Sequence, residues 1–203
     1  MSKNLLIVFA KNIKLGKVKT RLAKTVGDDA AFDVYKHLVE LTEKQTEKLE
    51  NCDIHIHFSD AIISNKWVNK EKFVQRGSDL GERMRNAFMD SFDKDYEKII
   101  GVGTDLPDLN AEIMQAGLNA LKNNDCVFGP AEDGGYYLIG MTKMIPCIFE
   151  DKPWSQDGLL DITIAQLLQK GYTVKTLTEL NDIDNINDLR ASSIAENFAH
   201  LLK

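Results

Sequence analysis

The chain has 203 residues, of which 43% are hydrophobic and 28% charged, a balance typical of a globular protein of one domain. The net charge of −6 argues against nucleic acid as a partner, because proteins that bind a phosphate backbone are usually basic. The first ten residues hold one lysine among the initial polar residues and then a short apolar run, too short for a signal peptide or a membrane span, so we expect a cytoplasmic protein without membrane contact.

Apolar runs alternate along the chain with segments of helical periodicity. Strands are expected at 4–10, 52–58, 73–75, 98–102, 126–129, 136–140 and 172–177. Helices are expected at 28–50, 79–92, 110–123, 156–169 and 186–202. This alternation predicts an α/β fold with a largely parallel sheet. No linker or repeat divides the chain, so residues 1–203 are expected to form a single domain.

Several local features refine this picture. Asp28 or Asp29 is a candidate cap for the first long helix, and Asp108 is a candidate cap for the helix that begins near residue 110. The helix at 79–92 is expected to turn one apolar face inward, formed by Leu80, Met84, Ala87 and Phe88.

The histidines and cysteines give little sign of a site. His55 and His57 share one face of a strand, but a metal site needs further ligands and no third is evident, so we interpret both as surface residues. Cys52, Cys126 and Cys147 form no CxxC motif, and we interpret them as reduced thiols of the core.

A basic loop, KNIKLGKVKTRL at 11–22, follows the first strand and opposes the negative charge of the whole chain. It is not a Walker A motif, because that motif requires a glycine where this chain has Lys11. The loop nevertheless offers Gly16 for close backbone approach and several groups for phosphate oxygens. These groups are Lys17, Lys19, Thr20 and Arg21.

In an extended segment, Lys17, Lys19 and Arg21 would point the same way and would repel one another unless an anion were present. We therefore favour phosphate binding. The alternatives are a solvated basic loop, or cations that pair with nearby carboxylates such as Asp28.

Asp105, in the segment GTDLPDL, follows the strand expected at 98–102 and is held in a stiff turn by Pro107. Ligands of α/β sheets bind beyond the carboxyl ends of the strands, where both Asp105 and the basic loop are expected to lie. A carboxylate there suits Mg²⁺ or Mn²⁺ bound together with substrate phosphates. Asp105 is therefore the leading candidate for a metal ligand.

The segment GPAEDGGYYLIG at 129–140 places Asp133 before Gly134 and Gly135 at the entrance of a strand. Asp133 could orient a sugar hydroxyl, act as a base or contact the metal, and the glycines would let a ligand approach the backbone. The alternative is a tight turn chosen for its geometry alone. Trp154 could stack on a base or sugar, or could simply cover the core.

The segment NDIDNINDL at 181–189 is rich in carboxylates. Asn185 or Asn187 could cap the last helix with Asp188 in its first turn, and Asp184 could reach the crevice as a second metal ligand.

Taken together, these motifs resemble a bacterial family of glycosyltransferase-A-like proteins, the radical-SAM/selenodomain-associated transferases of the nucleotide-diphospho-sugar transferase superfamily. The resemblance spans nearly the whole chain. It differs at Ile13, where the family usually has proline, and at Asn185-Ile186. The matching segments are FAKNIKLGKVKTRLA, QRGSDLGERM, GTDLPDL, GPAEDGGYYLIG, the Trp154-Ser155 pair and DIDNINDL.

The resemblance implies a Rossmann-like three-layer α/β/α sandwich with a mixed, mostly parallel sheet. It implies that Asp105 and Asp184 bind a divalent metal, Mg²⁺ or Mn²⁺. It further implies that Lys11, Gly16, Lys19 and Arg21 hold the phosphates of a nucleotide, whose base or ribose is lined by Gln75, Asp79, Leu80 and Arg83.

The leading hypothesis is a metal-dependent transferase that moves a group from a nucleotide-sugar or a nucleoside triphosphate to a small-molecule acceptor. Asp105 and Asp133 are its candidate catalytic residues, and Gly134, Gly135, Trp154 and Ser155 its candidate substrate-binding residues. Two alternatives stay open: a guanylyltransferase-like nucleotidyltransferase that releases pyrophosphate, and a non-catalytic nucleotide-binding module. The oligomeric state also stays open, with a homodimer as one alternative.

Overall fold

The computed structural model describes residues 3–150, 152, 154 and 158–203, and in this part of the chain it contains a seven-stranded sheet. The strand order is β3-β2-β1-β4-β6-β5-β7. β6 runs antiparallel to both of its neighbours, and the other neighbouring pairs are parallel, so the predicted α/β fold is confirmed. The strands are β1 (Asn4–Ala10), β2 (Asp53–Phe58), β3 (Glu71–Val74), β4 (Lys98–Val102), β5 (Cys126–Pro130), β6 (Tyr136–Met141) and β7 (Val174–Thr176).

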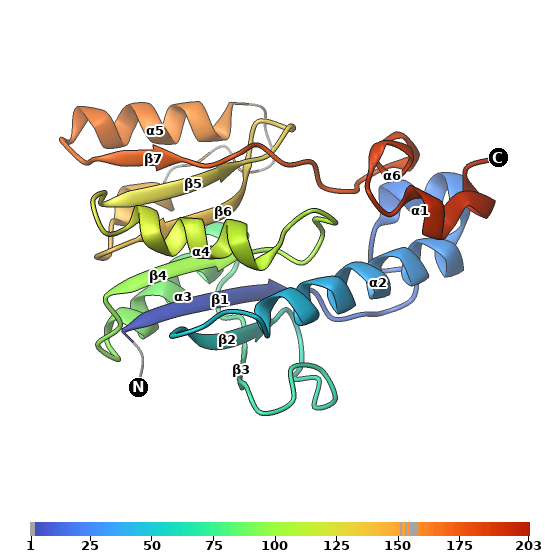
Figure 1. Ribbon diagram of the computed structural model, residues 1–203, viewed down its shortest axis with the longest axis horizontal. Coiled ribbons are helices and arrows are strands. Elements are labelled where there is room, and N and C mark those ends of the chain that lie inside the picture. The colour runs from blue at the N-terminus through green and yellow to red at the C-terminus, as the bar shows by residue number, and fades with distance from the viewer. Residues whose placement is uncertain (1–2, 151, 153, 155–157) are drawn as a thin grey trace.

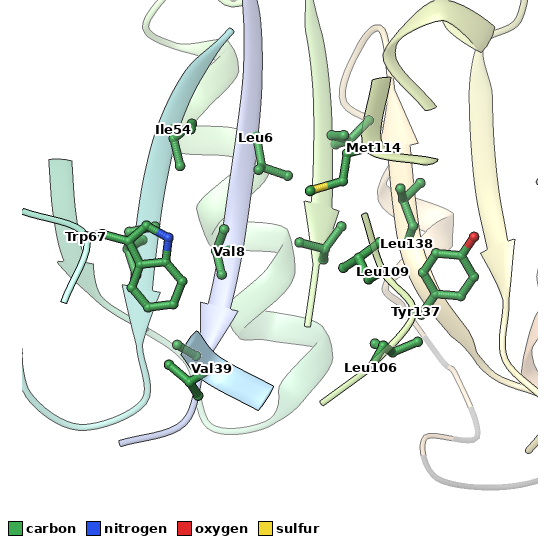
Figure 2. Close-up of a cluster of buried hydrophobic side chains, with 14 of the residues drawn as sticks. Leu6, Val8, Val39, Ile54, Trp67, Leu106, Leu109, Met114, Tyr137 and Leu138 are labelled. Atoms are coloured by element: carbon green, nitrogen blue, oxygen red, sulfur yellow. The ribbon is translucent and has the colours of Figure 1, made fainter. Parts of the chain in front are cut away.

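Helices cover both faces of the sheet, which explains why β1 is a continuous apolar run. Leu6 and Val8 point to the layer that contains α2 and α4, and Leu5 and Ile7 point to the layer that contains α3 and α5. Figure 1 shows α2 and α4 in front of the sheet and α3 behind it, and Figure 2 shows side chains of the first layer. The helices are α2 (Asp28–Thr46), α3 (Leu80–Phe92), α4 (Ala111–Ala120) and α5 (Leu159–Gln169).

A third apolar cluster is formed by elements that lie beyond the carboxyl end of β1, and Figure 1 shows where these elements lie. We call it the end cluster. It joins one side of α2 to three short elements, and its core is Leu22, Ala31, Val34, Leu38, Ile183, Leu189, Ile194 and Phe198. The short elements are α1 (Thr20–Val26), α6 (Ile186–Ala191) and the 3₁₀ helix η2 (Ala195–Leu201); a further 3₁₀ turn, η1, spans Pro146–Ile148. None of the described helices is both long and apolar enough to cross a bilayer.

The expectation of one closing helix at 186–202 is wrong. The chain leaves helical geometry at Ser192, where the backbone is extended, and resumes as η2. The Ser192 hydroxyl donates to the carbonyl of Leu189 at 2.8 Å, a local bond that competes with continued helix formation.

The helix caps are only partly those expected. Asn185 caps α6 in a reciprocal capping box with Asp188, as predicted. The first long helix is capped by Gly27, and Asp28 and Asp29 lie in its first turn. Their negative charges interact favourably there with the positive end of the helix dipole. The cap of α4 is Asn110, whose side chain accepts from the backbone of Ile113 at 2.9 Å, so Asp108 is not the cap.

The prediction that the two strand histidines lie at the surface is wrong. The exposed fraction is 2% for His55 and 6% for His57, because β2 lies between two other strands and β3 brings Phe73 over both rings. The centroid of the Phe73 ring lies 5.1 Å from that of His55 and 4.9 Å from that of His57. The three cysteines are free thiols, as predicted.

Burial of His57 predicts a pH-dependent stability. Its Nε2 atom is buried without a hydrogen-bond partner among the described residues, and burial, reinforced by His55, lowers its pKa to about 4. Between pH 6.5 and pH 4 the unfolded chain binds a proton that the folded protein excludes, so the free energy of unfolding falls as the pH falls, by about 3 kcal/mol over this window.

His57→Phe keeps an aromatic ring against Phe73 and removes this titration. We expect urea unfolding at pH 7, 6, 5 and 4 to show a smaller loss of stability in the variant than in the wild type. His200→Gln, which alters an exposed residue, serves as the control. A loss of equal size in His57→Phe and the wild type would contradict the prediction.

Candidate functional site

Loops at the carboxyl ends of the parallel strands surround one open hollow of about 920 Å³, which we call the main cleft. Lys11 lines it from the loop after β1, Gln75 from the segment after β3, and Asp105 from the segment after β4. Asp133 lines it from the turn between β5 and β6. The structure therefore brings the basic loop and the strand-end carboxylate to one edge of the sheet, where α/β folds bind ligands.

A second hollow of about 230 Å³, which we call the ionic chamber, shares Lys11, Lys17, Tyr35, Asp105 and Asp184 with the main cleft. Four cationic side chains line it and only two carboxylates, so positive charge is in excess. Its lining consists of Lys11, Lys17, Val18, Lys19, Thr20, Arg21, Tyr35, Asp105 and Asp184.

The basic loop is not extended through to Arg21. Lys19 adopts the left-handed conformation at φ 47°, and helix α1 begins at the next residue. The side chains of the loop cations therefore do not all point the same way. That of Lys19 is 5% exposed, whereas that of Arg21 is 73% exposed. A left-handed backbone is unfavourable for lysine, so tertiary contacts must hold it there.

Those contacts are ion pairs. The ammonium of Lys19 lies 3.3 Å from Oδ2 of Asp105 and 3.4 Å from Oδ1 of Asp184, and Arg21 donates to Oδ2 of Asp184 at 2.8 Å. The alternative that the loop cations pair with carboxylates is thus correct, but the partners are these two residues. Among the described residues Asp28 makes no ion pair within 4.0 Å.

The charged groups of the site shift one another's pKa values. Burial alone would lower the pKa of Lys19, but the carboxylates of Asp105, Asp184 and Asp182 outweigh it and raise that pKa above its usual value. Burial alone would raise the pKa of Asp105, but Lys19 and Lys11 outweigh it and lower that pKa. Lys19 and Asp105 are therefore both charged at neutral pH.

Asp182 behaves differently from its neighbours. Burial, with the charges of Asp105 and Asp184, raises the pKa of Asp182 to about 6. Asp182 lines the main cleft, and the sequence analysis did not select it as a site residue. The carboxyl group of Asp182 therefore takes up a proton at a higher pH than an ordinary aspartate does.

The backbone fixes the two ion-paired carboxylates relative to each other. The N–H of Ile183 donates to the carbonyl of Asp105 at 3.2 Å, which ties the segment before α6 to the segment after β4. A Cβ atom added at Gly103 would lie 2.9 Å from Oδ1 of Asp105, so glycine leaves room for that carboxylate beside its own strand end.

The donor set fits a hard divalent cation that arrives with its substrate. Carboxylate oxygens suit Mg²⁺ or Mn²⁺, and the ammonium of Lys19 already stands between Asp105 and Asp184 as a cation. Across the described ranges no three His, Cys, Asp or Glu side chains are grouped to hold a metal. Two carboxylates suffice for Mg²⁺ when phosphates and water complete its coordination.

Tyr35 is a site residue that the sequence analysis missed. Its hydroxyl accepts from the N–H of Lys11 at 3.1 Å and lies 2.9 Å from Oγ1 of Thr104. It thereby braces the start of the basic loop against the end of β4. Tyr35 lies among core residues of α2, and nothing in its sequence context distinguishes it from them.

Asn12 was also missed. Its side chain accepts from the N–H groups of Asp60 and Ala61 and donates to the carbonyl of Ala61 at 2.7 Å. Lys14 lies 3.1 Å from Oδ2 of Asp60. The loops after β1 and β2 are therefore fastened together at the rim of the main cleft.

The residues expected at the base or ribose surround the start of α3, and all four line the main cleft. Asp79 also caps α3, since its Oδ1 accepts from Glu82 at 2.8 Å, and Gln75 donates to the carbonyl of His57 at 2.8 Å. Arg83 donates to the carbonyl of Gly77 at 3.1 Å. Leu80 is 50% exposed, so the expectation that it belongs to the inward face of α3 is wrong. It is the first residue of the helix and lines the main cleft.

On the opposite side of the cleft, Asp133 forms the tight turn considered above: its Oδ1 accepts from Gly135 at 2.9 Å. Asp133 and Gly135 line the main cleft. Gly134, in the left-handed region at φ 81°, belongs to the same turn but does not line the main cleft. Gly16, at φ 70°, likewise turns the basic loop without lining either hollow.

Trp154 lines the main cleft and packs against the start of α3. A Cβ atom added at Gly81 would lie 2.6 Å from the indole ring, so glycine is required for this close approach. Ser155, the other candidate of this pair, lies outside the described residues.

Comparison with known proteins identifies relatives. A family model described as "Uncharacterized protein conserved in bacteria (DUF2064)" matches residues 42–156. A crystal structure from Desulfovibrio desulfuricans G20, provisionally named a nucleotide-diphospho-sugar transferase, is 32% identical with a TM-score of 0.90, and the match covers 99% of this chain and 97% of that one. No curated protein matches the chain in sequence.

More distant structures share the fold alone. The 4-diphosphocytidyl-2C-methyl-D-erythritol synthase of Anaerococcus prevotii is 11% identical with a TM-score of 0.63, over 96% of this chain and 99% of that one. A CMP:2-keto-3-deoxy-manno-octonic acid synthetase in complex with CTP is 9% identical with a TM-score of 0.59, over 97% and 99%. The fold is therefore that of the nucleotide-diphospho-sugar transferases, as the sequence motifs predicted, and the chain belongs to the DUF2064 family.

Proposed function

We propose that this protein is a metal-dependent transferase whose donor is a nucleoside triphosphate or a nucleotide-sugar. The observation that carries the proposal is the ionic chamber, in which four cations and two carboxylates meet beside a cleft large enough for a nucleotide. The name of the Desulfovibrio relative and the CTP bound by a protein of the same fold are consistent with it.

In this proposal Lys11, Lys17, Lys19 and Arg21 bind the phosphate tail, and Asp105 and Asp184 hold Mg²⁺ or Mn²⁺. When bound, the metal would neutralise the negative charge that develops on the departing phosphate. Gln75, Asp79, Leu80 and Arg83 face the base or ribose. A small-molecule acceptor enters on the side of Asp133, Gly135 and Trp154.

A nucleotidyltransferase is the more specific candidate, and the excess of positive charge in the ionic chamber favours it. A triphosphate carries more negative charge than the diphosphate of a nucleotide-sugar. In nucleotidyl transfer a phosphate of the acceptor would attack the α-phosphorus, and the bond from that phosphorus to the two terminal phosphates would break, so that they leave as pyrophosphate. In glycosyl transfer the acceptor hydroxyl attacks the anomeric carbon instead, and a nucleoside diphosphate leaves.

A thermal-shift screen tests the donor class. The purified protein is heated with nucleoside triphosphates and nucleotide-sugars, each with and without Mg²⁺ or Mn²⁺. A ligand that binds only the folded state raises the melting temperature. A metal-dependent shift with a triphosphate supports nucleotidyl transfer, and one with a nucleotide-sugar supports glycosyl transfer. No shift with any donor would contradict the proposal.

The metal role of Asp105 predicts the outcome of Asp105→Asn. In the wild type, Mg²⁺ is expected to tighten binding of the donor found in the screen. In the variant this gain is expected to disappear, because an amide binds hard cations far more weakly than a carboxylate. Isothermal titration calorimetry with and without Mg²⁺ measures both. Asp108→Asn, an exposed residue three positions on, is the matched control, and an equal gain in Asp105→Asn would refute the role.

The phosphate role of the basic loop predicts weaker donor binding in Lys19→Ala and in Arg21→Ala. Each variant loses one charged hydrogen bond to phosphate, which costs roughly 1.5–3 kcal/mol, or about a ten- to hundredfold rise in Kd. Titrations at saturating Mg²⁺ keep the contribution of the metal the same in all variants. Lys24→Ala, on the exposed side of α1, is expected to bind as the wild type does. Unaltered Kd values in both loop variants would reject the assignment.

A further inference from the structure

The ammonium of Lys19 is shared between two carboxylates and is bound closely by neither. Its distances of 3.3 Å to Asp105 and 3.4 Å to Asp184 exceed the roughly 2.7–2.9 Å of a strong charge-assisted hydrogen bond. The neighbouring contact of Arg21 with Asp184 has such a length, 2.8 Å. Arg21 therefore makes the shorter contact with Asp184, whereas the ammonium of Lys19 is divided between the two acids.

This position has a clear electrostatic reason. Two carboxylates held near each other in partly buried surroundings require a cation, because an uncompensated charge there is strongly unfavourable. Lys19 supplies it from a buried position, and the left-handed backbone at Lys19 is retained in spite of its cost.

Lys19 occupies one oxygen of each acid, Oδ2 of Asp105 and Oδ1 of Asp184. A divalent cation held by the same two carboxylates would come close to the ammonium, and two cations so near each other repel strongly. The oxygens can thus serve Lys19 or the metal, but not both.

The ionic chamber offers the displaced ammonium another place. It opens directly beside Lys19 and is lined by Lys11 and Lys17, which make no ion pair within 4.0 Å in the part of the chain that the structure describes. The lysine stem has four flexible carbons, so its charge can swing from carboxylate to phosphate without movement of α1. Phosphate oxygens in the chamber would draw Lys19 away from the acids and so vacate the metal position.

We propose that Lys19 is a displaceable counter-cation, which neutralises Asp105 and Asp184 in the free protein and yields their oxygens to the metal when the donor's phosphates arrive. The inference rests on the proposed function, since it takes the two acids as metal ligands. It follows that the metal binds weakly to the free protein and that metal and donor strengthen each other's binding.

The first test measures Mn²⁺ alone, without nucleotide, by isothermal titration calorimetry on the wild type, Lys19→Gln and Lys24→Gln. Lys24→Gln is the matched control, because it removes the same charge five residues along the chain, on the exposed side of α1. We expect Lys19→Gln to bind Mn²⁺ about tenfold or more tightly than the wild type, and Lys24→Gln to match the wild type. Equal affinity in Lys19→Gln and the wild type would overturn the proposal, as would absence of Mn²⁺ binding in every variant.

A second measurement uses the unaltered protein. The side-chain ¹⁵N resonance of Lys19, identified by its loss in Lys19→Gln, is expected to shift when Mg²⁺ is added to saturation. A resonance that stays in place while Mg²⁺ binds would refute displacement. If Lys19→Gln does not fold, Lys19→Met, which keeps an apolar stem of similar length, takes its place in both experiments.

These outcomes are separable from those of the proposed function. Tighter Mn²⁺ binding by Lys19→Gln stands even if no nucleotide or nucleotide-sugar binds, in which case the donor assignment alone fails. Conversely, equal Mn²⁺ affinities remove the displacement and leave the donor-binding experiments intact.

Discussion

The shared ammonium of Lys19 connects three segments that are distant in the chain: the start of α1, the end of β4 and the approach to α6. Its pairs with Asp105 and Asp184 hold the basic loop against the sheet edge, and the backbone bond from Ile183 to Asp105 closes the same junction. Without these contacts like charges would drive the loop apart. The site is therefore organised before any ligand binds, which lowers the entropic cost of binding.

The direction of β6 explains why one cleft can have two unlike sides. A parallel neighbour would begin at the far end of the sheet, after a long crossover. Because β6 is antiparallel to β4 and β5, the short turn that carries Asp133 returns at the carboxyl edge. One side of the main cleft is consequently built by the loops after β1 to β4, of which the first is cationic, and the other by a compact glycine turn and Trp154.

Much of this could be read from the sequence, because buried strands and strand-end charges leave local patterns. The apolar runs located β1 and β4 to the residue, and position after a strand selected Asp105. Contacts between remote segments leave no such pattern. The left-handed turn at Lys19 depends on acids 86 and 165 residues away, and the brace from Tyr35 to Thr104 spans 69 residues. His57 is buried in part because β3 adds the ring of Phe73 beside it.

The end cluster has its own apolar core, separate from the two layers on the sheet, and carries Lys19, Arg21 and Asp184 at its margin. The free energy required to unfold a small cluster of this kind locally is lower than that required to unfold a central sheet. Each local opening would disperse the charged groups while β1 and β4 remain intact. Ligand affinity would then depend on how often this cluster is closed, and a bound ligand would slow amide hydrogen exchange in α1 and α6 more than in the sheet.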